Sequence, residues 1–148
     1  MGVGAAMFGE ASGRRNIILG CLALGMSKRE IAESIDGLVA FTELGDAIDR
    51  PLNTYSSGMR ARVQFVVATA MLPKILMIDE ALGVGDKNFR HKSNERIGQV
   101  ISRAGTLLMV NHSLDELRKW CTRAIWVSEG KVRLDGPLEF VLDAYAEH

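Results

Sequence analysis

A turn of small residues before a predicted helix is the first group in this sequence that can take part in chemistry. Ser56-Ser57-Gly58 opens the helix, where either hydroxyl can cap it and the glycine allows close backbone approach. The first turn of a helix has unpaired N–H groups and the positive end of the helix dipole, so it attracts anions such as phosphate. The turn is a candidate phosphate site, although an ordinary capped helix has the same pattern.

Two adjacent carboxylates follow a predicted strand. The continuous apolar run 75–78 is typical of a buried parallel strand, and Asp79 and Glu80 come directly after it. The carboxyl ends of such strands are where open α/β sheets bind ligands. Asp79 can hold Mg²⁺ through water, and Glu80 can activate an attacking water molecule. The alternative is a strand that simply ends in polar residues.

A turn and a histidine complete the set. The glycine-bearing turn 83–85 leads to Asp86, and His112 follows a second apolar run at 106–110. A lone histidine at a strand end is usually a surface or capping residue. Beside a phosphate, however, its ring can contact both that phosphate and the attacking water.

Helix caps, turns and periodicity predict the elements that position these residues. Ser27 and Glu30 form a capping-box pattern, Ser113 and Glu116 repeat it, and Glu129 with Gly130 indicates a hairpin. The expected helices cover about 13–24, 27–44, 57–70, 87–103, 113–120 and 137–145, and the expected strands cover 75–78, 106–110, 124–127 and 131–134.

Composition excludes several classes of protein. The 148 residues carry 18 basic and 18 acidic side chains, so the clustered basic excess of a nucleic-acid-binding protein is missing. Cys21 and Cys121 lie far apart without metal-ligand spacing, and no secretory signal is recognised, which favours a reducing cytosol. No apolar run approaches the length needed to cross a bilayer.

The chemical groups follow one another as they do in the ATPase domain of ABC transporters, which this chain resembles. The stretch Tyr55 to Met59 resembles the family signature, in the variant found in exporters of polysaccharide, O-antigen and teichoic acid. Residues 75–80 match Walker B with the catalytic glutamate, and residues 81–86 match the D-loop. His112 matches the switch histidine, and the resemblance covers nearly the whole chain.

The resemblance implies ATP and Mg²⁺ as cofactors and a homodimer in which the signature of one subunit caps ATP held by the other. The implied roles are γ-phosphate binding by Ser56, Ser57 and Gly58, Mg²⁺ positioning through water by Asp79, polarisation of water by Glu80, coupling of the two sites by Asp86, and γ-phosphate sensing by His112. Ser57 stands where the family has its first signature glycine and adds a hydroxyl donor, and Met59 stands in place of glutamine and removes an amide.

The implied fold is the C-terminal part of a P-loop NTPase domain of ABC type, an α/β class with a mostly parallel sheet and a helical subdomain. We expect residues 1–55 to form an irregular start and that subdomain, and residues 56–148 to form the signature helix and the α/β part. The phosphate loop GxxxxGK[ST] (Walker A) occurs nowhere in the sequence. We therefore expect partly uncovered strand faces and no ATPase activity from these residues alone.

The sequence and the resemblance leave two main alternatives for the function. The first is part of an ATP-binding subunit that drives export of a polysaccharide or lipid-linked glycan, peripheral on the cytoplasmic face of the membrane and bound to an integral membrane permease. The second is a non-catalytic domain that acts only by docking to a permease or a partner ATPase. A soluble ABC ATPase of DNA repair or translation is a weaker alternative, disfavoured by the export-type signature.

Overall fold

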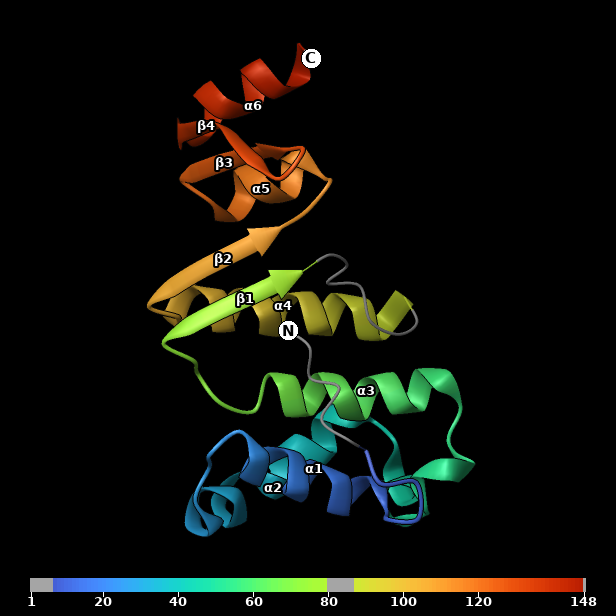
Figure 1. Ribbon diagram of the computed structural model, residues 1–148. Coiled ribbons are helices and arrows are strands. Elements are labelled where there is room, and N and C mark those ends of the chain that lie inside the picture. Colours follow the sequence, from blue (N-terminus) through green and yellow to red (C-terminus); the bar gives the residue numbers. More distant parts are fainter. Residues whose placement is uncertain (1–6, 80–86, 148) are drawn as a thin grey trace.

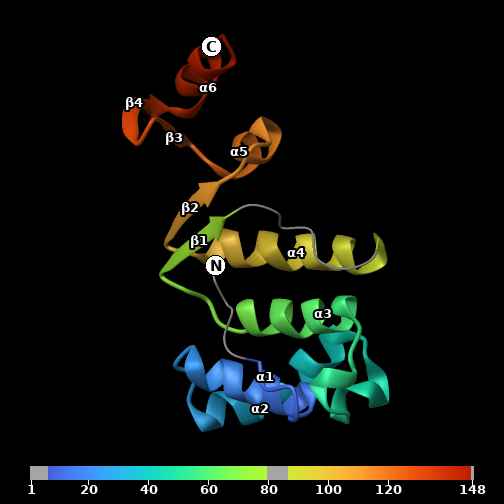
Figure 2. The ribbon, with the colours of Figure 1, turned by 45° about the vertical axis from the view of Figure 1, so that its right-hand side comes forward.

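The computed structural model describes residues 7–79 and 87–147. Figures 1 and 2 show three layers stacked along the long direction of the molecule. A helical unit at one end is followed by a helix with a pair of strands, and a hairpin with two short helices forms the other end. The alternation of helices and strands after residue 56 confirms the α/β class that the sequence predicts.

The helical unit contains α1 (Gly13–Ala23), α2 (Lys28–Thr42), two 3₁₀ helices, η1 (Gly45–Asp49) and η2 (Leu52–Thr54), and α3 (Ser57–Ala68). Serine caps set the starts of its α-helices, as the sequence predicts. Ser12 accepts from the Arg15 amide at 3.2 Å, and Ser27 with Glu30 forms a complete capping box. The hydrogen bonds from Ser27 lower the pKa of the Glu30 carboxyl.

The end of α2 differs from the prediction. The sequence places it at Gly45-Asp46, but the helix ends at Thr42 and Glu43 adopts a left-handed conformation with φ 56°. A left-handed residue after the last turn is a common way to end a helix, and here a glutamate takes the place usually filled by glycine. Gly45, with φ 53°, then starts η1.

One hydrophobic core joins the three long helices of the unit. Ile17 of α1 and Val63, Val66 and Val67 of α3 are almost fully buried in it, together with Ile31 and Leu38 of α2. Because α3 packs here and also carries the signature turn, it physically connects the two parts expected at residues 1–55 and 56–148. That division of the chain stays a prediction.

The middle layer is a strand–helix–strand unit of β1 (Ile75–Asp79), α4 (Lys87–Arg103) and β2 (Thr106–Val110). The strands are parallel, with Ile75 opposite Thr106 and Asp79 opposite Val110. Leu76 and Ile78 are buried against Val100 of α4. The other face is uncovered, as expected: Ile75, Met77, Leu108 and Val110 are each more than half exposed.

The last layer consists of α5 (Leu114–Trp120), the antiparallel strands β3 (Arg123–Ser128) and β4 (Lys131–Pro137), and α6 (Leu138–Ala146). Positive φ angles at Glu129 and Gly130, 53° and 73°, form the predicted hairpin turn. The capping box predicted for α5 is only half formed. Ser113 accepts from the Glu116 amide, but the Glu116 side chain accepts instead from the indole of Trp120.

Candidate functional site

The signature turn is a regular N-terminal helix cap. Ser56 is the capping residue, and its Oγ accepts from the Met59 amide at 3.2 Å. This selects Ser56 over Ser57, the two alternatives that the sequence leaves open. Ser57 and Gly58 occupy the first helical positions, and both are exposed. The serine hydroxyl and the free amides of this turn therefore face solvent at the positive end of α3.

No contact within the described part of the chain explains the glycine at position 58. Among residues 7–79 and 87–147, a Cβ added there would meet only Ser56 Oγ, at an ordinary 3.9 Å, and the residue is not among those with positive φ. A larger side chain would instead extend into the open space over the helix end. Gly58 therefore leaves room for a group that approaches the turn from outside the chain, which fits the size and charge of a phosphate.

The residues before the turn hold it in place. Tyr55 is 5 % exposed, and its hydroxyl donates to the Ala47 carbonyl at 2.6 Å. Burial raises the pKa of the Tyr55 phenol, so the hydroxyl keeps its proton and remains a donor. Arg60 donates from the first turn of α3 to the Asn53 carbonyl at 3.1 Å. The turn is therefore anchored on both sides while its own amides stay exposed.

A second group of site residues lies at the carboxyl ends of the parallel strands. Asp79 is the last residue of β1, it is exposed, and it is opposite Val110 in the ladder. His112 follows two residues later and is also exposed. Asn111 fixes the local backbone because its Oδ1 accepts from the Ser113 amide at 2.9 Å. Parallel register thus brings Asp79 and His112 to the same edge of the sheet. Glu80 and Asp86, the predicted catalytic and coupling carboxylates, lie outside the described residues.

These two groups lie on opposite sides of α4. Figures 1 and 2 both show α4 running between α3 and the strand pair. Buried side chains agree, since α4 contacts Phe65 of α3 through Phe89 and contacts Leu76 of β1 through Val100. The structure therefore brings Asp79 and His112 together but separates both from the signature turn.

The donors present suit Mg²⁺ that is held mainly by water and phosphate oxygens. Over residues 7–79 and 87–147, no group of three or more histidine, cysteine or acidic side chains is gathered as a metal site. Asp79 is the carboxylate at the sheet edge, and Mg²⁺ commonly binds through one or two carboxylates with several waters retained. Asp79 fits that minor role and would not hold the ion alone.

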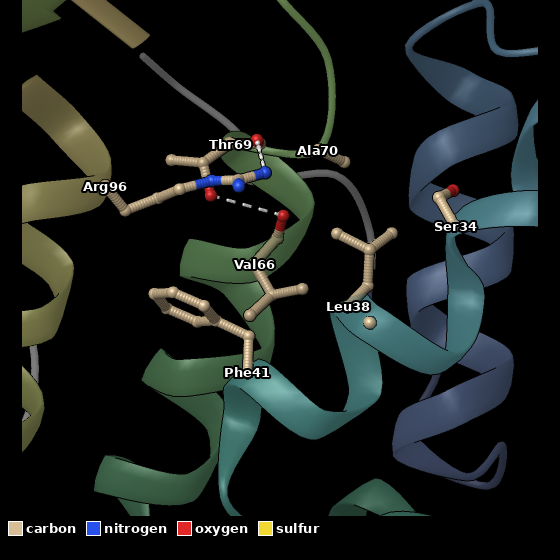
Figure 3. A pocket seen from close by; sticks show the side chains of 8 residues that line it. Ser34, Leu38, Phe41, Val66, Thr69, Ala70 and Arg96 are labelled. Atoms are coloured by element: carbon tan, nitrogen blue, oxygen red, sulfur yellow. Dashed lines mark hydrogen bonds between the residues drawn. The ribbon is translucent and has the colours of Figure 1, made fainter. Parts of the chain in front are cut away.

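A pocket of about 260 Å³ opens at the junction of α2, α3 and α4. Figure 3 shows Arg96 reaching across it to the carbonyl of Thr69, a hydrogen bond of 3.0 Å. Apolar side chains, Leu38, Phe41 and Val66 among them, line it below this arginine. The pocket is a small apolar site with one cation at its rim, and the sequence analysis did not predict it.

Comparison with known proteins gives close relatives over almost the whole chain. The teichoic acids export ATP-binding protein TagH of Lactococcus lactis is 40% identical over 141 residues, 95% of this chain and 30% of that protein. The O-antigen export system ATP-binding protein RfbB of Myxococcus xanthus is 41% identical over 145 residues, 98% and 33% of the two chains. A protein of the same name from Klebsiella pneumoniae is 36% identical, with 98% and 59% covered. Over almost its whole length the chain is therefore similar to ATP-binding proteins of teichoic acid and O-antigen export.

The similarity covers only part of each known protein. The chain spans between about a third and three fifths of the length of these curated relatives. No family model matches it. Among solved structures, the ATP-binding subunit of an ABC transporter superposes with a TM-score of 0.72 at 24% identity, covering 94% of this chain and 58% of that one. A dimeric ATP-binding cassette in a post-hydrolysis state superposes with a TM-score of 0.62 at 20% identity. The ABC-type fold that the sequence predicts is confirmed for the part spanned.

Sequence reasoning missed the residues that join α4 to the helical unit. Phe41, Phe65 and Phe89 come from three different helices and pack together, with Lys92 and Arg96 placed over Phe41. The ring partners of Phe89 lie 24 and 48 residues earlier in the sequence. Only the fold shows this association.

Proposed function

We propose that the chain is part of the ATP-binding subunit of an ABC exporter, which couples ATP hydrolysis to export of a polysaccharide or lipid-linked glycan. The observation that carries the proposal is the capped signature turn, with an exposed Gly58 for which the residues that the structure describes offer no packing reason. Relatives 36% to 41% identical are named as ATP-binding proteins of teichoic acid and O-antigen export, which supports the same reading.

The separation of the site residues supports a homodimer. An α-helix with its side chains is about 10–12 Å across, so α4 keeps the signature turn and the edge of the sheet at least one helix diameter apart. Direct hydrogen bonds to one phosphate span about 3 Å, so a single copy does not bring both groups to it. A second copy supplies the missing half: the signature turn of one copy faces the nucleotide held by the other.

In this arrangement each site residue has a separate role toward the phosphate, the Mg²⁺ ion or the attacking water. Ser56, Ser57 and Gly58 donate to the terminal phosphate across the interface, and Asp86 connects the two sites. Asp79 orients water around Mg²⁺, which neutralises charge on the phosphates when it is bound. Glu80 accepts a proton from the attacking water, and His112 donates to the same phosphate.

The pocket between α2, α3 and α4 supports contact with a permease. It combines apolar walls with Arg96 at the rim, so it suits an apolar side chain next to an acidic or carbonyl group. No helix over residues 7–79 and 87–147 has the length and apolar character to cross a bilayer. We propose that the subunit works at the cytoplasmic face of the membrane and docks there through this pocket. Docking without hydrolysis is the second candidate function, because the pocket needs no nucleotide.

Nucleotide titration tests the proposal. A fluorescent ATP analogue with Mg²⁺ is titrated onto the chain alone and onto a chimera in which a segment with a GxxxxGK[ST] loop, from an O-antigen export relative, precedes it. We expect saturable binding and hydrolysis only in the chimera. Glu80→Gln and His112→Ala should retain binding and lose hydrolysis. Full hydrolysis by the Glu80→Gln chimera would contradict the assigned role, and robust hydrolysis by the unmodified chain alone would contradict the proposal as a whole.

A further inference from the structure

A small aromatic cluster connects two larger cores of the molecule. The helical unit has one core around Val63 and Val66, and the strand pair has another around Leu76 and Val100. Between them lies a cluster built on Phe65, Phe89 and Ile97. Phe41 packs against both this cluster and the helical core, and Ile101 packs against both this cluster and the strand core.

Each of its three rings comes from a different helix. Phe41 of α2 stacks on Phe65 of α3 with centroids 6.0 Å apart and an interplanar angle of 19°. Phe89 of α4 meets both edge-on, at 5.9 and 5.7 Å. These are favourable aromatic geometries, and Phe89 is fully buried. One side chain of α4 thus contacts both other helices.

Charged side chains surround the rings and converge on the end of α2. Lys92 of α4 lies 4.5 Å from the Phe41 centroid and bonds to Glu43 at 2.7 Å. Arg62 of α3 lies over Phe89 at 4.7 Å and donates to the Thr42 carbonyl at 3.1 Å. The last carbonyls of a helix lack internal partners and carry the negative end of its dipole, so both cations are well placed there.

This cluster lies between the two halves of the proposed site. The signature turn lies at the start of α3, and Asp79 ends the strand that packs on the opposite side of α4. Any change in the seating of α4 on α2 and α3 therefore changes the placement of Asp79 relative to Ser56. Phe41 and Arg96 also line the pocket proposed for the permease, so an occupant of that pocket contacts the same side chains.

We propose that Phe41, Phe89 and Lys92, with Glu43, form a positioning joint that sets the orientation of the strand pair relative to the signature turn. They are positioning residues, since none of them lies at the signature turn or the sheet edge. Their effect on hydrolysis rests on the proposed function, whereas their effect on orientation does not. Occupation of the adjacent pocket acts on the same joint through Phe41 and Arg96.

The joint is tested first by a distance within the 148-residue chain. Spin labels are attached at Gln64→Cys on α3 and Thr106→Cys on β2, both exposed positions. Cys121 is replaced by serine, and Cys21 is fully buried and stays in place. The distance distribution is measured by pulsed electron paramagnetic resonance, with circular dichroism to confirm that each variant is folded.

Lys92→Met removes the charge and keeps most of the side-chain length, and Phe89→Leu removes the ring. We expect both to displace or broaden the distance distribution, and Lys92→Arg to restore it. Lys119→Met is the matched control because Lys119 likewise lies over a ring, 4.7 Å from the centroid of Trp120, but in α5. It should leave the distribution unchanged. If Phe89→Leu fails to fold, the distance distribution of Lys92→Met still tests the proposal, because Lys92 is partly exposed. A distribution unchanged in Lys92→Met overturns the proposal.

The chimera with a phosphate loop provides the second readout. Lys92→Met should lower kcat for ATP hydrolysis with KM for MgATP unchanged, and Lys92→Arg should recover kcat. A loss that appears only as fewer folded molecules, with kcat per folded molecule unchanged, contradicts the positioning role. If no chimera hydrolyses ATP while the label distances shift as expected, the proposed function fails and the joint stands.

Discussion

Gly20 is the residue at which ordinary helix preference and packing in this fold act in opposite directions. It lies in α1, where alanine is favoured over glycine by about 1 kcal/mol. However, a Cβ at this position would meet Cγ1 and Cγ2 of Val67 at 2.5 and 2.9 Å. Val67 is fully buried in α3, so its methyl groups have no room to move away. Overpacking of this kind destabilises by about 1–3 kcal/mol.

We therefore expect Gly20→Ala to destabilise the fold by about 1 kcal/mol after the gain in helix preference is subtracted. For a domain of this size, that lowers the melting temperature by roughly 3 °C. Urea and thermal unfolding followed by circular dichroism measure both values. Gly37→Ala in α2 is the matched control, because a Cβ there meets nothing within 4 Å. It should stabilise by about 0.5–1 kcal/mol.

A double variant separates packing from other causes. Val67→Ala alone leaves a cavity in the core of the helical unit, but in the Gly20→Ala background the new methyl group fills part of that space. The second substitution should therefore destabilise less in that background than it does alone. A Gly20→Ala protein as stable as the Gly37→Ala protein would refute the close approach of α1 and α3 on which this reasoning depends.

Three further predictions follow from the caps, the ion pairs and the uncovered sheet face. Ser56→Ala should lower unfolding stability by about 1 kcal/mol through loss of the cap to the Met59 amide, whereas Ser57→Ala should not; urea unfolding compares them. The hydrogen bond from Arg14 lowers the pKa of Asp49 below the ordinary 3.8, and the hydrogen bond from Arg123 does the same for Asp135. The stabilisation that each ionised aspartate gives the fold is therefore present above pH 3.8 and is lost as the pH falls through the lowered pKa. Urea midpoints from pH 7 to 3 should therefore fall less in Asp49→Asn and Asp135→Asn than in the parent. Met77→Lys on the exposed strand face should reduce self-association in light scattering and keep the fold, whereas Leu76→Lys, on the buried face, should unfold the chain.

Local sequence signals predicted the starts of the helices well because the bonds that decide them are local. Ser12, Ser27 and Ser56 each accept from an amide three residues later, so the cap and its partner can be read together. The end of α2 was less predictable. Glycine marks most left-handed helix ends, but here Glu43 adopts that conformation, and its carboxylate is paired with Lys92, 49 residues away in sequence.

The same distinction explains why the joint was missed. The helical spacing of Val63, Val66 and Val67 marks one apolar stripe on α3, and this stripe faces α1 and α2. Phe65 points to the other side, toward α4, because α3 is covered on two sides. A single helical stripe describes a helix with one covered face. An arginine so soon after the signature turn is typical of a solvated or phosphate-facing position. Arg62 instead lies over Phe89 and donates to the end of α2, which is visible only once the helices are placed.

The position of the joint has a consequence for the proposed dimer. In that arrangement the signature turn of one copy serves one nucleotide, and Asp79 and His112 of the same copy serve the other. The two sites are then connected within each copy through α3, α4 and β1, and α4 meets α3 at the aromatic cluster. Because this cluster is small, a few side chains determine the relation between the two sites. A permease segment in the pocket beside Phe41 would therefore reach both sites through a single set of contacts, which gives a physical route by which docking and hydrolysis can influence each other.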